Sequence, residues 1–389
     1  MKKADWKINK LYLNTILMAF VSIILWGCSS TIHIPEAKPG AETYAMFGSG
    51  PERAFFVPVN IGDTLKLRWE GDINGGFAPT SITAYGNYVF VPDLSGRIYA
   101  FDAIKGKELG FIKFKGSIIP APIVEQFVLT FPLTGYKEDN SVIYNYNFHS
   151  GQETAKFEVQ GKVETEPVRM QDGIVFLTEQ GKAIKYSSSN EKLWEFDSKG
   201  FIHSSAASSG DNIVFGNDKG IIFNIDAKTG SLKYQKNIGN GFEGGFAISG
   251  DTVFTADNSG TVYCFRLSSG DVLWKYATGY KINVFPVSDG KYVYIGNLRG
   301  DIYKLQKNSG KLLWKVSTDG VINTTPLLFK DYLVQPDLNK KLHLINVDTG
   351  HIKRTMNFEG RNRLSPVYYG GTLFLGIDNG KVMAYESAR

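Results

Sequence analysis

The chain has 389 residues, and its 43 lysines and arginines against 38 aspartates and glutamates give a formal net charge of only +5. The basic residues form no long run, which excludes the clustered basic face of a nucleic-acid-binding protein. Two cysteines are too few for a disulfide framework. The 42 glycines and 13% aromatic residues instead favour an all-β protein with many turns.

Residues 1–27 have the pattern of a secretory signal peptide. Basic residues in 1–10 precede an apolar run over 11–26, which is short for a membrane span. The Gly-Cys junction at Cys28 resembles the lipobox of bacterial lipoproteins, which implies cleavage before Cys28 and acylation of its sulfur. The alternative is an uncleaved anchor helix, and both interpretations place the rest of the chain outside the cytoplasm. Ser29, where an aspartate would retain a lipoprotein in the inner membrane, favours an outer-membrane protein that faces the periplasm or the cell surface.

Residues 28–60 are expected to form a lipid-anchored tether. Their prolines and glycines interrupt any helical or strand periodicity. A flexible stretch of this length spans on the order of 30 Å, which would let the folded body stand away from the membrane. The folded domain is therefore predicted over residues 61–389.

A repeat of about 40 residues fills that domain. The segments 220–239, 260–279 and 300–320 each contain a short strand, a turn that ends in glycine, and a second strand with an aromatic residue near its start. Glycine or asparagine recurs in the turn because a left-handed backbone is expected there. These turn residues are Gly106, Gly151, Asn190, Gly230, Gly270, Gly310 and Gly350.

A second marker, at the start of an apolar strand, indicates how many copies there are. It occurs eight times, at Pro79, Pro122, Pro167, Ala206, Phe246, Pro286, Pro326 and Pro366. Four short strands in a repeat of this length predict the blade of a β-propeller, so eight markers predict eight blades. Each blade buries its faces only against its neighbours, and we therefore expect one monomeric, cooperative domain.

The two ends of the chain are expected to share one blade. The C-terminal segment KVMAYESAR supplies the third strand of blade 8, and residues 65–69 are left to supply the fourth. This arrangement closes the ring and removes open sheet edges.

An aromatic residue recurs in the strand that follows each turn, and we expect it to act as a structural wedge between neighbouring blades. The wedge residues are Trp69, Trp194, Tyr234, Trp274 and Trp314. Gly110, Ala155 and Arg354 occupy the same position in the other copies.

The pattern Asp-x-x-Thr-Gly followed by an aromatic residue, as at 226–234, resembles the repeat of pyrroloquinoline-quinone (PQQ) type propellers. The resemblance covers about residues 64–385 and implies an eight-bladed fold. Quinone-dependent dehydrogenases of this type carry adjacent cysteines, but Cys264 is the one cysteine within the repeats, so a dehydrogenase is the least favoured interpretation. The chain is more similar to the propeller lipoprotein of the outer-membrane β-barrel assembly machinery, which has this length, a lipobox and eight blades. That similarity implies a non-catalytic scaffold for envelope proteins, among them a barrel-assembly protein, with no cofactor.

Candidate site residues lie three positions before each strand marker, where repeat symmetry predicts a ring around one mouth of the central channel. These positions hold Gly76, Ile119, Glu164, His203, Glu243, Asn283, Asn323 and Arg363. The polar side chains among them could bind a small polar or saccharide ligand, which is the alternative function, or could order channel water. Glu164, His203 and Glu243 are the one combination suited to a metal, but we expect neither a metal nor another cofactor.

No catalytic residue is expected. His203 precedes Ser204, but adjacency in sequence does not give the geometry of a nucleophile and its base. Cys264 lies within an apolar strand and is expected to be buried and unreactive. The hairpin over residues 131–148 is about five residues longer than the repeat, so its tyrosines, at 136, 144 and 146, are candidate partner contacts.

Overall fold

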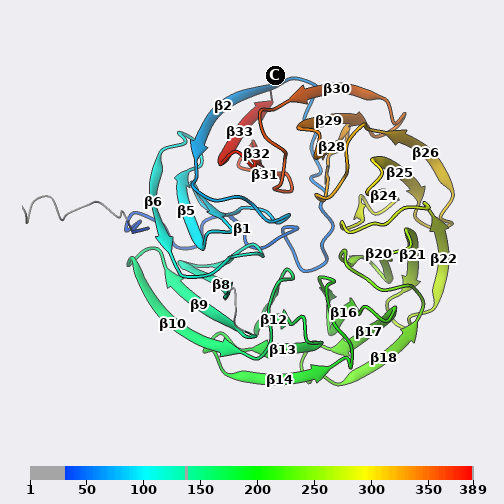
Figure 1. Ribbon diagram of the computed structural model, residues 1–389, viewed down its shortest axis with the longest axis horizontal. Helices are drawn as coiled ribbons and strands as arrows, with labels where there is room; N and C mark the ends of the chain where they lie inside the picture. Colours follow the sequence, from blue (N-terminus) through cyan, green and yellow to red (C-terminus); the bar gives the residue numbers. More distant parts are fainter. Residues whose placement is uncertain (1–30, 136–138, 388–389) are drawn as a thin grey trace, which may run out of the picture.

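The fold is the expected eight-bladed β-propeller. The computed structural model describes residues 31–135 and 139–387, so the signal segment and Cys28 lie outside the described residues. All regular structure in these residues is β-strand, and the strands form eight sheets around a central axis (Figure 1). Among the described residues, no helix is long and apolar enough to cross a membrane.

In blades 1 to 7, four antiparallel strands follow one another in sequence order from the channel outward. Blades 1 to 4 comprise β3 (Thr83–Tyr85), β4 (Tyr88–Pro92), β5 (Arg97–Asp102) and β6 (Glu108–Lys113); β7 (Ile123–Glu125), β8 (Val128–Thr134), β9 (Ser141–Asn147) and β10 (Gln152–Val159); β11 (Val168–Met170), β12 (Gly173–Leu177), β13 (Lys182–Tyr186) and β14 (Lys192–Asp197); β15 (Ala207–Ser209), β16 (Asn212–Gly216), β17 (Ile221–Asp226) and β18 (Leu232–Asn237). Blades 5 to 7 comprise β19 (Ala247–Ser249), β20 (Thr252–Ala256), β21 (Thr261–Arg266) and β22 (Val272–Ala277); β23 (Val287–Ser288), β24 (Tyr292–Gly296), β25 (Asp301–Gln306) and β26 (Leu312–Ser317); β27 (Leu327–Leu328), β28 (Tyr332–Pro336), β29 (Lys341–Asn346) and β30 (Ile352–Asn357).

Blade 8 is built from both ends of the chain. Its inner strands are β31 (Val367–Tyr369), β32 (Thr372–Ile377) and β33 (Lys381–Ser387), and its outer strand is β2 (Leu65–Asp72). The pairing of β2 with β33 runs from Leu65 opposite Ser387 to Asp72 opposite Lys381. The predicted closure of the ring by strands from the two ends is therefore confirmed.

Burial explains why these short segments form blades. The middle strands, such as β16 and β20, are buried along almost their whole length because neighbouring blades cover both of their faces. The outer strands are more exposed, and in β22 Trp274 is the one buried residue, with 8% of its surface exposed. A single blade would leave these apolar faces exposed to water, so the blades stabilise one another.

The wedge aromatics connect each outer strand to the next blade. Each ring donates a hydrogen bond to a carbonyl in the turn between the third and fourth strands of that blade. The bonds join Trp69 to Ala103 (3.0 Å), Trp194 to Ala227 (3.2 Å), Tyr234 to Leu267 (3.0 Å), Trp274 to Lys307 (2.6 Å) and Trp314 to Val347 (2.9 Å). The rings lie so close to the turn glycines that a Cβ atom on Gly230 would be 2.7 Å from Trp194. Glycine is therefore required both for its backbone conformation and for space.

Residues 31–60 differ from the expected tether. They cross one face of the propeller, from the rim of blade 2 through the centre to blade 7 (Figure 1). β1 (Thr43–Tyr44) adds to blade 1 by pairing with β3. Backbone N–H groups of five innermost strands then donate to this segment, from Val124 to Ala45, Ser208 to Pro51, Ile248 to Glu52, Ser288 to Ala54 and Leu328 to Phe55. The prolines and glycines do not produce a free coil because the blades satisfy the backbone of the segment.

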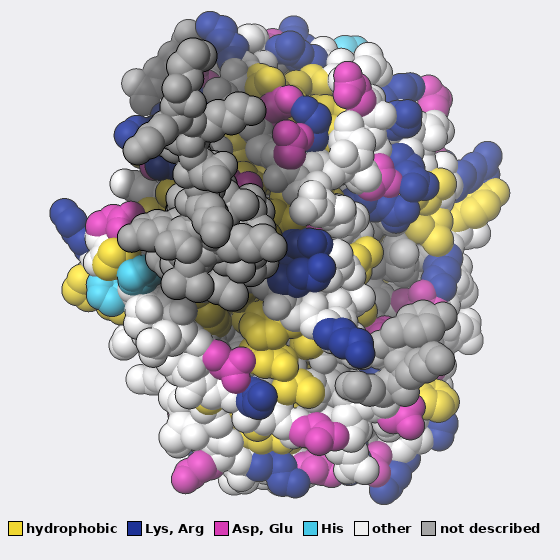
Figure 2. All heavy atoms as spheres, turned by 60° about the vertical axis from the view of Figure 1, so that its left-hand side comes forward, with side chains coloured by type: hydrophobic (Ala, Val, Ile, Leu, Met, Phe, Trp, Pro, Cys, Tyr) yellow, Lys and Arg dark blue, Asp and Glu magenta, His cyan; other side chains and the backbone are white. Residues whose placement is uncertain are grey.

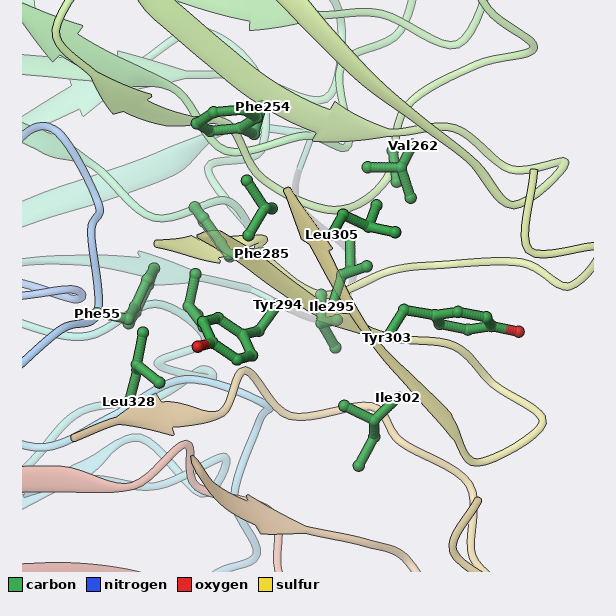
Figure 3. Close-up of a cluster of buried hydrophobic side chains, with 14 of the residues drawn as sticks. Phe55, Phe254, Val262, Phe285, Tyr294, Ile295, Ile302, Tyr303, Leu305 and Leu328 are labelled. Carbon is green, nitrogen blue, oxygen red and sulfur yellow. The ribbon is translucent and has the colours of Figure 1, made fainter. Parts of the chain in front are cut away.

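Residues 31–60, which we call the closing segment, close the channel at one end. We call this side of the propeller the closed face. The rings of Phe47, Phe55 and Phe285 form a triangle with centroids 5.0 to 5.3 Å apart. In Figure 3, Phe55 lies with Phe285 and Leu328 in the hydrophobic cluster that joins neighbouring blades. The folded unit therefore includes residues 31–60, and the expected boundary at residue 61 is corrected.

The two described tyrosines of the long hairpin of blade 2 pack within the propeller. Tyr136 lies outside the described residues. Tyr146 is buried and donates to the carbonyl of Ile32 (2.7 Å). Tyr144 stacks on Phe131 with centroids 5.8 Å apart. Both described tyrosines therefore stabilise the propeller itself.

Candidate functional site: the mouth of the channel

The channel is open at the face opposite residues 31–60, which we call the open face. Glu164, His203, Glu243 and Asn283 line one cavity there, with a volume of about 490 Å³. Each lies in the loop that leads from the outer strand of one blade into the innermost strand of the next. Because these loops enter the channel at equivalent positions, side chains 40 residues apart in sequence meet in one cavity.

This cavity is lined by only part of the predicted ring. Asn323 and Arg363 are not among the residues that line this cavity. Arg363 instead lies 3.5 Å from the Asp378 carboxylate. Gly76 does not line this cavity either. β3 begins at Thr83 rather than directly after Pro79, and Pro79 itself lines the cavity.

His203 lies between two carboxylates. Its Nδ1 atom is 3.0 Å from Asp218, and its Nε2 atom is 3.6 Å from Glu179. Burial alone would lower the pKa of His203, but the two carboxylates outweigh it and raise this pKa above its ordinary value. His203 therefore keeps its positive charge to a higher pH than a free histidine.

The rest of the rim combines charges of both signs. Glu243 pairs with Lys281 at 2.5 Å, and Glu164 is exposed. The side-chain oxygen of Asn283 is buried and has no hydrogen-bond partner among the described residues. The mouth thus offers carboxylates, an amide and an imidazolium to a small polar ligand.

Glu166, which sequence analysis did not identify, lies in the wall of the same cavity. Its carboxylate accepts hydrogen bonds from the Thr80 hydroxyl (2.5 Å) and the Ala121 N–H (3.0 Å). Burial raises the pKa of Glu166 to about 7, although these two bonds and Arg53 oppose the rise. This carboxyl therefore titrates near neutral pH.

Arg53 from the closing segment is completely buried at the centre of the molecule. Its guanidinium donates to the carbonyls of Pro167 (2.7 Å) and Ala206 (3.3 Å), and also to that of Phe47. Burial lowers the pKa of Arg53 to about 10, while the nearby Glu166 carboxylate favours its charged form. Arg53 thus connects the closing segment to the innermost strands of blades 3 and 4.

Asp218 was also missed by sequence analysis, although the repeat contains a signal that could have located it. Asp218 follows Asn217 in the turn between the second and third strands, and an Asp or Asn equivalent to Asn217 recurs in other blades. The recurring residues are Asp93, Asn217, Asp257, Asn297 and Asp337, each of which accepts two backbone N–H groups of its own turn. Aligning these turns would have placed Asp218 on the open face. No local pattern marks Arg53, because three of its four carbonyl partners lie more than a hundred residues away.

Two side chains with nucleophilic atoms, Ser204 and Cys264, are hydrogen-bonded or buried within the fold. The Ser204 hydroxyl donates to the carbonyl of Gly216 (2.8 Å), which turns it from His203. Cys264 is buried, and burial raises the pKa of its thiol to about 12, so it is a poor nucleophile. Among the described residues, no group of three His, Cys, Asp or Glu side chains is arranged to hold a metal ion.

A protein-family model described as "Outer membrane protein assembly factor BamB" matches residues 63–276 and 277–389. The chain belongs to the BamB family. Among solved structures, BamB from Moraxella catarrhalis matches with a TM-score of 0.72 and 13% identity, over 83% of this chain and 100% of that one. A computationally designed protein, Ika8, matches with a TM-score of 0.70 and 14% identity, over 81% of this chain and 100% of that one. No curated protein matches the chain.

These comparisons have two consequences. At such low identity the likeness to BamB and to a designed propeller shows the fold alone. The BamB family match begins at residue 63, so the closing segment and Arg53 lie outside it.

Proposed function

We propose that this chain is a non-catalytic scaffold of the outer membrane, anchored by lipid at Cys28 and facing the periplasm, where it binds other proteins of envelope assembly. The observation that carries the proposal is the BamB family match, which extends over both halves of the propeller. A rigid ring with many exposed turns is well suited to hold partners.

The surface character supports a binding role. On the uncovered part of the face in Figure 2, Lys and Arg side chains are interspersed with Asp and Glu, and hydrophobic side chains lie between them. Outer-strand leucines such as Leu193 and Leu313 are more than two-fifths exposed. Interfaces that form and separate are about as apolar as the rest of a protein surface, so a mixed surface of this kind suits a reversible partner.

The closing segment gives the proposed anchor a defined geometry. The described chain begins at Thr31. Three residues later, the N–H of Ile34 donates to the carbonyl of Phe148 at the rim of blade 2. An acylated Cys28 would be only three residues away from Thr31, so the chain between them reaches about 10 Å at most. The anchor would hold the closed face toward the bilayer and direct the open face away from it.

The test is an affinity purification of the tagged lipoprotein from its own membranes in mild detergent, read by mass spectrometry. Recovery of an outer-membrane barrel-assembly protein is the expected result. The Cys28→Ser variant, with an unchanged propeller, controls for co-purification through lipid alone. Recovery of lipid without any envelope protein would contradict the proposal.

A second candidate function is the binding of a small polar ligand at the mouth. It is favoured by one observation: the cavity of about 490 Å³ falls within the usual size of ligand pockets, roughly 300–1,000 Å³. Maltose and putrescine serve as neutral and cationic probes in a thermal-shift assay. A stabilisation that is lost in His203→Ala but retained in His351→Ala, an exposed turn histidine, would support this function.

A further inference from the structure

The wedge position recurs at every boundary between blades, and most boundaries fill it. Five carry the aromatic rings described above. At the boundary of blades 7 and 8, Arg354 replaces the ring and donates to the carbonyl of Asp63 (3.2 Å). The interaction with the next blade is thus kept although the residue type differs.

The boundary of blades 1 and 2 is filled by the closing segment. Gly110 has no side chain to contribute there. The N–H of Ile34 donates to Phe148 (2.7 Å), the turn carbonyl equivalent to those that accept from the wedge rings. His33 covers Gly151, where a Cβ atom would lie 3.1 Å from the His33 side chain. Residues 33 and 34 therefore replace the missing wedge.

The boundary of blades 2 and 3 is different, because Ala155 occupies the wedge position and no described residue takes the place of the ring. A cavity of about 390 Å³ lies there, and Ala155 is part of its lining. Its lining comes from β8, β9 and β10 of blade 2 and from β12 and β13 of blade 3. Figure 1 shows these two blades side by side. The facing turn of blade 3 also differs, since Asn190 stands where other turns have glycine.

The walls of this cavity combine aromatic and hydrogen-bonding groups. Phe157 and Tyr186 are in contact, with centroids 4.5 Å apart, and both line the cavity. The polar side is a chain of hydrogen bonds, from the Thr130 hydroxyl to Asn145 (2.9 Å) and from Asn145 to Asn190 (2.9 Å). Apolar faces with one polar edge suit an aromatic ring that carries an N–H or O–H donor.

We propose that this cavity is a socket for a tryptophan or tyrosine side chain presented by a partner polypeptide. The repeat itself defines the occupant, because indole or phenol rings fill the equivalent position at five other boundaries. The partner polypeptide as the source of the ring rests on the proposed scaffolding function, whereas the chemistry of the socket does not. Aromatic residues are also the side chains that most often anchor protein interfaces.

The test uses N-acetyl-tryptophanamide as the probe and N-acetyl-leucinamide as its apolar control, with binding to the purified full-length lipoprotein followed by saturation-transfer NMR. The wild type is expected to bind the tryptophan probe with a dissociation constant on the order of 1 mM. The double variant Ala155→Trp with Asn190→Gly rebuilds the wedge and should weaken this binding at least about tenfold. Leu313→Trp, which adds a ring on an exposed outer strand, is the matched control and should bind as the wild type does.

Two results would overturn the socket: equal binding of the two probes by the wild type, or undiminished binding of the tryptophan probe by the double variant. Ala155→Phe fills less of the cavity and provides the same comparison if the double variant does not fold. If the tryptophan probe binds but no envelope protein co-purifies in the affinity experiment, the scaffolding function is contradicted and the socket is not. The two proposals can therefore fail independently.

Discussion

Arg53 is the residue on which the closing segment most depends. In Arg53→Met, four carbonyls lose this donor, and the Glu166 carboxylate loses the nearby cation. We expect the free energy of unfolding to fall by about 3–5 kcal/mol, the usual effect of leaving buried polar partners uncompensated. Urea denaturation of this variant against Glu52→Gln, whose side chain is exposed, measures the effect. Equal stability of the two variants would show that Arg53 only fills space.

Because of Glu166, the stability of the fold is expected to depend on pH, and the direction of this dependence follows from its pKa. Its pKa in the fold, about 7, lies above the ordinary value of 4.5. The proton is therefore bound more tightly in the folded state, so the contribution to stability is full below pH 4.5 and is lost as the pH rises through about 7. The stability of the wild type relative to Glu166→Gln should fall by up to about 3 kcal/mol across this window. His203 titrates in both proteins and cancels from the difference, and a flat difference would contradict the raised pKa.

Single residues also show where sequence reasoning ends. Glu164, His203, Glu243 and Asn283 could be assigned to one mouth because the repeat fixes their phase along the channel. Arg53 could not be assigned, because it belongs to the closing segment, which lies outside the repeat, and most of its partners belong to distant blades.

Among the structural elements, the outer strands illustrate how a wedge joins two blades. Trp194→Ala removes a buried ring and its bond to Ala227, so we expect a loss of about 3 kcal/mol in the free energy of unfolding. Trp194→Phe keeps most of the ring and should lose about 1 kcal/mol, the hydrogen bond alone. Leu193→Ala on the same strand is the control, because Leu193 is 46% exposed. Chemical denaturation of the three variants measures their free energies of unfolding. If Trp194→Phe were as unstable as Trp194→Ala, the division of the loss between the ring and its hydrogen bond would be contradicted.

The strands were predictable from the sequence and the closing segment was not, for one physical reason. Each blade repeats its own turns, so glycine and aromatic spacing reveal β16 or β20 without knowledge of the whole. Within residues 31–60 the backbone hydrogen bonds are confined to short turns, such as those from Ala37 to Ile34 and from Ser49 to Met46. Their backbone partners are supplied by blades 1, 2, 4, 5, 6 and 7, and such long-range pairing leaves no periodicity in the segment.

At the scale of the whole molecule, the closing segment makes the two faces of the ring unequal. One face is covered by residues 31–60, and the other carries the cavity with His203. A propeller closed only by β2 and β33 would have two open mouths. The closed face follows from 30 residues that the repeat does not include, and it determines how an anchored molecule would be oriented.

This asymmetry leads to a prediction about orientation at a membrane. Ser150 lies in a turn of blade 2 beside the closing segment, and Gln160 follows the outer strand of the same blade toward the open face; both are exposed. Cys264 is buried, and Cys28 is acylated under the proposed function, so Ser150→Cys and Gln160→Cys can each be labelled singly with a fluorophore. In vesicles that contain headgroup spin-labelled lipid, we expect at least about twofold stronger quenching at position 150, because a 10 Å connection holds that rim near the bilayer. Equal quenching at both positions would mean that the ring is not held by its closed face, and Cys28→Ser carrying each label gives the unanchored baseline.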